Sequence, residues 1–231
     1  MTDFKIALIV GAGDGLSASL ARLFSANGLQ VALAARNINK LESLKDEIGA
    51  HAFQCDAAQV DSVHQLFDAL DQSLGAPNVV VYNPSYRTRG PIVDLDPVAV
   101  QQALMVTAYG GFLVGQQAAK RMEANGKGAI LFTGASASVK GYPQSAPFAM
   151  GKFALRGLVQ SMARELAPKN IHVAHFIIDG AILPPGQKQP ADEPDRFLEP
   201  DAIATSYWHV LQQHCSAWTW EVELRPWVEK F

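Results

Sequence analysis

Short apolar segments alternate with longer segments of mixed polarity along the whole chain. The apolar segments are continuous, which is typical of strands buried on both faces of a parallel sheet. We expect strands at residues 5–10, 30–35, 79–82, 129–133 and 173–178, with a weaker one at 51–54. The segments between them predict helices at residues 16–26, 38–48, 60–74, 97–122, 147–166 and 201–213.

The order of these elements predicts an α/β fold. A repeated strand–helix–strand pattern implies right-handed crossovers and a doubly wound parallel sheet. The chain has 231 residues, 48% hydrophobic and 18% charged, which is enough for one domain with a large core. No linker divides it, so we expect a single domain over residues 1–231.

The longest irregular segment spans residues 179–200 and is rich in Pro, Gln and Asp. It follows the sixth strand, so it would leave the sheet at the carboxyl edge, where ligands bind in such folds. Loops of this length are usually functional or mobile. We interpret the segment as a lid over a substrate; the alternative is a solvated, disordered excursion.

Charge and cysteine content exclude several classes of partner. A net charge of -3 gives no electrostatic case for nucleic acid or an anionic membrane. No apolar run approaches the roughly 18 residues that span a bilayer, and residues 1–5 lack the features of a signal peptide. Cys55 and Cys215 lack metal-type spacing and fit reduced thiols, so we expect a cytoplasmic protein without a metal site.

A glycine-rich turn follows the first predicted strand. It reads Gly11-Ala12-Gly13-Asp14-Gly15-Leu16 and leads directly into a predicted helix. Glycines let the backbone turn tightly and let a pyrophosphate approach the amides at the helix start, where the dipole favours anions. This position predicts a dinucleotide site at Gly11, Gly13, Asp14, Gly15 and Leu16, although the Asp14 carboxylate is expected to face solvent or cap the helix. The alternative is a purely structural turn.

The residues after the second strand bear on the choice of cofactor. A carboxylate about 20 residues past the turn would bind the ribose 2′-hydroxyl and select NAD(H). The segment Leu33-Ala34-Ala35-Arg36-Asn37 has no acid there. Arg36 instead offers a planar fork suited to a 2′-phosphate, which favours NADP(H) over NAD(H). The alternative is that Arg36 is an ordinary exposed residue.

Together these features resemble the short-chain dehydrogenase/reductase (SDR) family. The turn is similar to the family's Thr-Gly-x-x-x-Gly-x-Gly, with Val10 and Ser17 at its first and last positions. Cys55-Asp56-Ala57 resembles the acidic corner that meets the adenine, and Asn83 matches one residue of the family's Asn-Asn-Ala-Gly. The resemblance implies a single-domain Rossmann-type sheet of about seven strands, the last at 221–224. It adds Asp56, Ala57, Asn83 and Lys152 to the expected cofactor-binding residues.

The catalytic signature departs from the family. In Tyr-x-x-x-Lys, the Tyr hydroxyl protonates the reduced carbonyl oxygen, while the Lys binds the nicotinamide ribose and lowers the pKa of the Tyr. Here the pair is Phe148 and Lys152, one turn apart on a helix. The family's Ser falls on Ala135 beside Ser136, its Asn on Thr107, and its Pro-Gly on Ile178-Asp179. The resemblance therefore places Lys152, Phe148, Ser136 and Thr107 at the catalytic positions, without the usual proton donor.

Other polar groups in loops or beside the sixth strand could reach the site. They are Tyr86, Ser136, Ser138, Tyr142, His175 and Asp179, and we interpret each as a loop polar group or a packed ring. Three hypotheses stay open, in order. The first is an NADP(H)-binding oxidoreductase acting without a Tyr, on iminium ions or conjugated enones. The second is a non-catalytic homologue that binds the nucleotide as a structural or sensing ligand. The third is a scaffold or partner subunit that has kept only the fold.

The resemblance also implies a homodimer or homotetramer that pairs the two long helices. Small residues on these helices allow close approach between subunits or, equally, against the chain's own sheet: Gly110, Gly111, Gly115, Ala149, Gly151, Ala154 and Gly157. The aromatic tail from Trp218 to Trp227 suits a subunit contact; the alternative is that it folds back over its own core.

Overall fold

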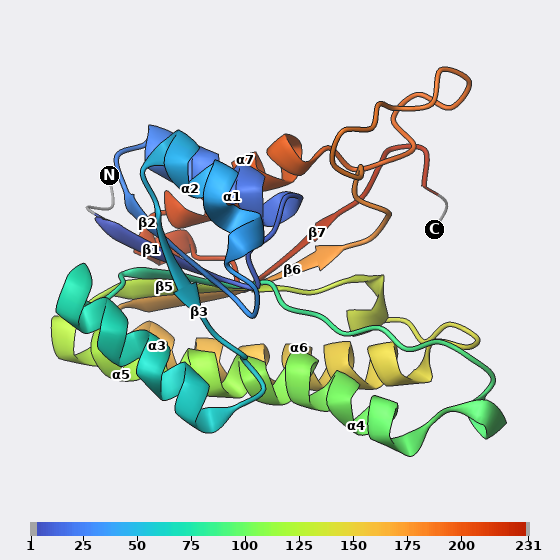
Figure 1. Ribbon diagram of the computed structural model, residues 1–231, viewed down its shortest axis with the longest axis horizontal. Helices are drawn as coiled ribbons and strands as arrows, with labels where there is room; N and C mark the ends of the chain where they lie inside the picture. The colour runs from blue at the N-terminus through green and yellow to red at the C-terminus, as the bar shows by residue number, and fades with distance from the viewer. Residues whose placement is uncertain (1–3, 230–231) are drawn as a thin grey trace.

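One parallel sheet of seven strands forms the middle of three layers (Figure 1). The computed structural model describes residues 4–229. The strand order is β3-β2-β1-β4-β5-β6-β7, which confirms the predicted doubly wound fold. The strands are β1 (Ile6–Val10), β2 (Gln30–Ala35), β3 (His51–Gln54), β4 (Val79–Tyr82), β5 (Gly128–Thr133), β6 (Ile171–Ile178) and β7 (Glu221–Leu224).

The central strands are apolar on both faces because helices cover both faces. Every residue of β1, β4, β5 and β6 is buried, whereas the edge strands β3 and β7 are partly exposed. This difference explains why the β3 pattern is the weaker one in the sequence: an edge strand meets solvent and needs fewer apolar side chains.

Helices divide between the two faces of the sheet (Figure 1). One side holds α1 (Leu16–Ala26), α2 (Glu42–Ile48) and α7 (Pro200–Leu211); the other holds α3 (Val60–Ser73), α4 (Pro97–Leu104), α5 (Gly110–Asn125) and α6 (Ala146–Leu166). Each side has its own core, built around Phe24 and Tyr207 on the first face and Phe67 and Phe132 on the second. Truncating one of these phenylalanines to alanine would cost about 3–5 kcal/mol.

The predicted single helix over 97–122 is interrupted. Asp96 caps α4, with its carboxylate accepting hydrogen bonds from Val98 N (3.0 Å) and Ala99 N (3.3 Å). A π-helical turn, Met105–Tyr109, then separates α4 from α5. The Tyr82 hydroxyl donates to the carbonyl of Val106 in this turn, so a side chain from the sheet occupies a backbone acceptor. No pattern in the sequence predicts this bond. Likewise, a 3-10 turn, Asn39–Leu41, replaces the first residues of the helix predicted at 38–48.

Close internal packing explains most of the small residues on α5 and α6. A Cβ on Gly110 would lie 2.6 Å from Ala57 O, and one on Gly151 would lie 2.9 Å from Thr107 Cβ. Gly111 and Gly115 face Leu155 and Met162 in the same way.

The helical segment Pro97–Asn125 is long and apolar enough, by length and composition alone, to cross a membrane, and 44% of its most apolar window is buried inside this fold.

The tail folds back over its own chain, the second of the two alternatives for it. Trp218 stacks on His172 of β6 with ring centroids 4.6 Å apart, and Arg156 of α6 lies 5.5 Å from the Trp220 ring. Trp227 is different: it is 79% exposed and its indole N–H donates to Asp195 of the 179–200 segment. That segment has an isolated bridge between Ile182 and Leu198 at its base.

Candidate active site

Two adjoining hollows open at the carboxyl ends of the central strands. The larger, about 770 Å³, lies beyond β4, β5 and β6, and the smaller, about 350 Å³, lies beyond β1 and β2. Asn83 and Ser85, directly after β4, line both. The strand order reverses between β1 and β4, and ligands bind at such a point in doubly wound sheets. We call these the large cavity and the nucleotide hollow.

The glycine turn forms one wall of the nucleotide hollow. Gly11 has φ +82°, and a Cβ there would lie 2.6 Å from Pro84 N, so no other residue fits. The Ser17 hydroxyl donates to Gly11 O (3.2 Å) and accepts from Asn83 Nδ2 (2.8 Å). Ser17, in the place of the family's last glycine, thus ties the turn to the end of β4.

Two residues of the predicted turn site direct their side chains elsewhere. Asp14 is exposed and lines a separate hollow with Arg22 and Leu183. This position agrees with the expectation that its carboxylate faces away from the ligand. The Leu16 side chain is buried in the first core. Only the backbone of these residues is left to face a phosphate, and their amides lie at the start of α1.

A second cation joins Arg36 at the far end of the nucleotide hollow. Arg36 and Lys40 both line it, and the Lys40 ammonium lies 3.7 Å from where a Cβ on Gly13 would be. Asp56 and Ala57 line it from the end of β3, with Asp56 Oδ1 accepting from Ala58 N at 3.0 Å. Sequence reasoning missed Lys40; its only signal was the spacing of four from Arg36. A cramped glycine turn facing two cations fits a 2′-phosphorylated dinucleotide.

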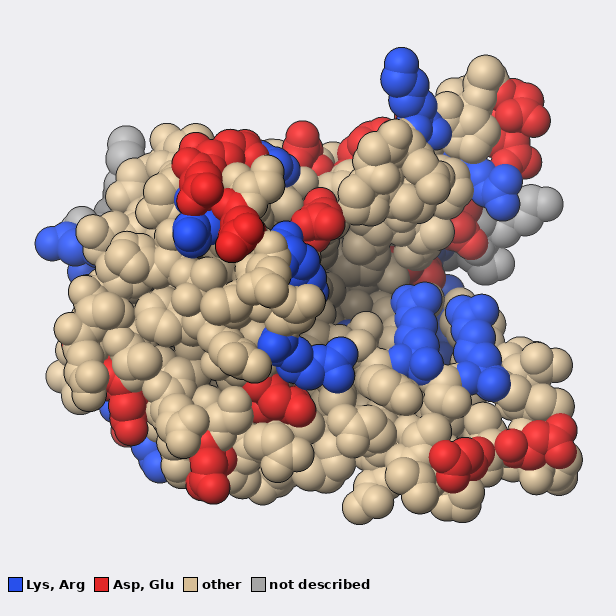
Figure 2. Space-filling view, viewed as in Figure 1, with Lys and Arg blue, Asp and Glu red and all other residues tan. Residues whose placement is uncertain are grey.

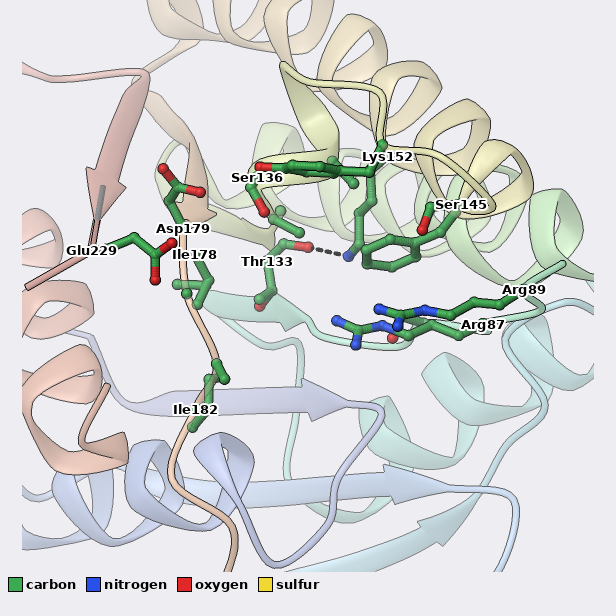
Figure 3. A pocket seen from close by; sticks show the side chains of 18 of the residues that line it. Arg87, Arg89, Thr133, Ser136, Ser145, Lys152, Ile178, Asp179, Ile182 and Glu229 are labelled. Carbon is green, nitrogen blue, oxygen red and sulfur yellow. Dashed lines mark hydrogen bonds between the residues drawn. The ribbon is translucent and has the colours of Figure 1, made fainter. Parts of the chain in front are cut away.

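Lys152 lies at the inner wall of the large cavity, which Phe148 also lines (Figure 3). It is 2% exposed, and its ammonium donates to Thr133 O at 2.7 Å. Burial and, to a smaller extent, the positive charge of Arg87 together lower the pKa of Lys152 to about 7. The Phe148 ring is buried too, with its centroid 5.9 Å from Lys152 Nζ. The pair therefore shares one face of α6, as the spacing predicts.

Two arginines of the loop after β4 reach the same cavity. The Arg87 guanidinium lies over the Phe148 ring, 4.4 Å from its centroid, and Arg89 extends beside it (Figure 3). Partial burial and the charge of Arg89 both lower the pKa of Arg87. Sequence reasoning missed both, because periodicity does not show where a loop side chain points. The signal was two arginines closely following a strand.

The other two predicted catalytic positions separate. Ser136 lines the large cavity from the 3-10 turn after β5. Thr107 is fully buried in the π-helical turn, outside the lining of the cavity. Its hydroxyl has no hydrogen-bond partner in the part of the chain that the structure describes. It is packed against Gly151 of α6, the residue before Lys152, and does not reach the cavity lining.

The alternative proton donors also divide. Tyr142 and Asp179 line the large cavity, but the Asp179 carboxylate accepts from Lys140 (3.3 Å) and Arg225 (2.5 Å). Ser138 and His175 are fully buried and join Glu221 in a chain: Ser138 Oγ to His175 Nε2, 3.3 Å, and His175 Nδ1 to Glu221, 3.1 Å. Neither lines the cavity, and nor does Tyr86.

Comparisons with known proteins agree with this arrangement. The family described as short chain dehydrogenase matches residues 5–191. A 7alpha-hydroxysteroid dehydrogenase of Escherichia coli (strain K12) is 31% identical over 78% of this chain and 72% of that protein. A short-chain dehydrogenase from Rhodopseudomonas palustris is 37% identical, with TM-score 0.83, over 96% of this chain and 99% of that one.

A metagenomic short-chain oxidoreductase solved in complex with NADP is 25% identical, with TM-score 0.85, over 97% of this chain and 98% of that one. The chain spans about two thirds of the length of the curated relatives it matches, for example 68% of one and 66% of another. The similarity thus covers the sheet, the glycine turn and both hollows.

Proposed function

This chain belongs to the short-chain dehydrogenase/reductase family, and from that premise we propose that it is an NADP(H)-dependent oxidoreductase whose chemistry does not pass through a tyrosine. Bound NADPH supplies a hydride to an acceptor. The observation that carries the proposal is Phe148: the large cavity and Lys152 are retained, but the ring beside them has no proton to give.

Different residues of the chain would bind different parts of the cofactor. Gly11 N and Ala12 N both donate to Ala34 O, so the pyrophosphate would meet the amides at the start of α1, at the positive end of the helix dipole. Arg36 and Lys40 would hold the 2′-phosphate, and Asp56 would face the adenine from the same hollow. Lys152, fixed by Thr133 O, donates its remaining hydrogens toward the nicotinamide ribose.

The absent hydroxyl restricts the acceptor. A ketone oxygen that receives negative charge needs a positioned acid, which is worth about 10²–10⁴ in rate. An iminium carbon that accepts a hydride becomes a neutral amine and needs no proton. A conjugated enone takes its proton at carbon from water. We therefore propose iminium ions or enones as the acceptor class.

The segment 179–200 is proposed as the lid of this site. Its first residues, from Asp179 to Ile182, line the large cavity, and the bridge between Ile182 and Leu198 closes the base of the loop. The side chain of Gln189 donates to Phe197 O (2.9 Å) and accepts from Phe197 N (3.1 Å), which holds the loop together from within. An ordered loop of this kind favours the lid over a disordered excursion.

The proposal is tested by NADPH oxidation with three acceptors: a cyclic iminium ion, cyclohexenone and cyclohexanone. We expect turnover of the first or second, and a kcat/KM at least about 100-fold lower for the saturated ketone. Lys152→Met should abolish all of it. Faster reduction of cyclohexanone than of the other two would contradict the proposal.

One alternative function has an observation in its favour. Neither Phe148 nor the buried Thr107 offers a titratable group to the large cavity, as expected of a homologue that only binds the nucleotide. Tight NADPH binding with no turnover of any acceptor would select that sensing role over catalysis. No NADPH binding would leave only a scaffold.

A further inference from the structure

The walls of the large cavity carry opposite charges. Arg87, Arg89 and Lys152 lie on the side of β4 and α6, and Asp179 and Glu229 lie on the other (Figure 3). Asp179 is already neutralised, because Lys140 and Arg225 both bind its carboxylate. In Figure 2, basic side chains gather along the lower rim of the hollow in that face. The accessible charge of the wall beside Phe148 is therefore positive.

The two arginines have no anionic partner of their own. Among residues 4–229, neither Arg87 nor Arg89 makes an ion pair or a side-chain hydrogen bond, whereas the guanidiniums of Arg22, Arg121 and Arg156 all bind carboxylates. Two like charges side by side repel each other and lose some hydration at the cavity wall. An anion between them would relieve both costs.

Phe148 orients this pair. The Arg87 guanidinium lies 4.4 Å from the ring centroid, over the face of the ring, where the ring quadrupole attracts a cation. This contact holds the planar fork of Arg87 toward the interior and beside Arg89. The ring at position 148 thus has a use in the cavity other than proton transfer.

The arginines are also separate from the phosphate-binding side of the nucleotide hollow. That hollow has its own cations, Arg36 and Lys40, and its lining includes neither Arg87 nor Arg89. We propose that Arg87 and Arg89 bind an oxyanion of the substrate, a carboxylate or a phosphate, so that the iminium or enone acceptor also carries an anionic group, anchored at the β4 side of the large cavity. The proposal deepens the function above and rests on the large cavity being the substrate site.

A planar guanidinium donates two parallel hydrogen bonds to a carboxylate or a phosphate, and this fixes both the orientation and the position of the ligand. An anchor at Arg87 and Arg89 would hold the rest of the substrate against the inner wall formed by Lys152, Thr133 and Ser136. The cavity then selects acidic acceptors over neutral ones of the same size.

The test is calorimetric binding of three probes of similar size: hydrocinnamate, its neutral amide, and phenyl phosphate. Each is titrated into the protein alone and into the protein saturated with NADP⁺, whose own binding is measured first. We expect one or both oxyanions to bind at least tenfold more tightly than the amide, and the stronger of the two identifies carboxylate or phosphate as the natural group. The double variant Arg87→Gln/Arg89→Gln should remove this preference, and Arg87→Lys/Arg89→Lys should keep part of it.

Arg164→Gln is the matched control, because Arg164 is on α6 outside the cavity and, among residues 4–229, binds only Gln160 O. Equal affinity for acid and amide, no binding of either oxyanion, or an unchanged preference in the Gln double variant would each overturn the proposal. So would weaker NADP⁺ binding in the Gln double variant without a change in probe affinity, since the arginines would then serve the cofactor. Failure of the wild-type protein to bind NADP⁺ would instead count against the proposed function, and the probes still report on the protein alone.

Discussion

Single residues decide what the two hollows can bind. Arg36, after β2, and Lys40, in the 3-10 turn Asn39–Leu41, place two positive charges at one end of the nucleotide hollow. A ribose 2′-hydroxyl would leave both without a counter-charge, whereas a 2′-phosphate would pair with both.

We expect Arg36→Gln/Lys40→Gln to raise the Kd of NADPH about 10- to 100-fold, a loss of about 1.4–2.8 kcal/mol, because both cations contact only the extra phosphate. The Kd of NADH should stay within about threefold of the wild-type value. Quenching or enhancement of nicotinamide fluorescence measures both. Lys45→Gln, which removes an exposed cation of α2, is the control. Equal weakening of NADPH and NADH would contradict the assignment.

At the scale of elements, β6 and β7 are joined through a buried polar chain. His175 on β6 is fully buried between Ser138 and Glu221, and Arg156 of α6 binds the same Glu221 carboxylate through two nitrogens, at 2.6 and 2.8 Å. Burial is the largest effect on the pKa of His175; with the charges of Lys152 and Arg156 it lowers this pKa from 6.5 to about 4, against the opposing effect of Glu221.

Because the pKa of His175 is lower in the folded protein than in the unfolded chain, the protein is expected to lose stability in acid. Below pH 6.5 the unfolded chain protonates this histidine, while the folded chain stays neutral until pH falls to about 4. The unfolded state then holds more protons, so stability falls as pH falls. From pH 7 to pH 5 the loss from this group is about 2 kcal/mol in the free energy of unfolding. Urea denaturation at both pH values measures it.

His175→Asn should be less stable at pH 7 but lose less between pH 7 and pH 5, because the replacement does not titrate. An equally steep fall in the variant would assign the pH dependence to other groups.

Some elements and site residues could be predicted from the sequence, and others could not. The strands were found almost residue by residue, since helices on both faces force continuous apolar runs. The π-helical turn was not, because it depends on Tyr82 reaching Val106 O from a strand 24 residues earlier. The glycine turn and Lys152 could be placed from spacing within one element. Arg87 and Arg89 could not, because their positions depend on how a loop folds over α6.

For the whole molecule, the notable surface is an exposed apolar one. It lies on α5, on α6 and on the turn before α5. Tyr109, Phe112, Met150 and Phe153 are each 38–49% exposed, and Tyr109 stacks on Phe112. Burying such side chains stabilises association by about 25 cal/mol per Å² before the costs of binding. We expect these helices to pair with those of a second copy.

Light scattering during size exclusion should therefore give a dimer or tetramer for the wild-type chain. Phe112→Glu/Phe153→Glu should shift it toward the monomer, because buried carboxylates would face each other across the interface. Val93→Glu changes an apolar residue that is 85% exposed elsewhere and should leave the mass unchanged. A wild-type monomer would refute the pairing.

Phe148 is proposed to support a cation and to give no proton. The measurement that tests this is kcat/KM for reduction of a keto acid, compared between the wild-type protein and Phe148→Tyr. A tyrosine there would stand one turn from Lys152, whose charge favours the phenolate. We expect the variant to gain about 10²–10⁴ in kcat/KM while its NADPH affinity is unchanged. A wild-type protein that already reduces the keto acid as fast as the variant would contradict it.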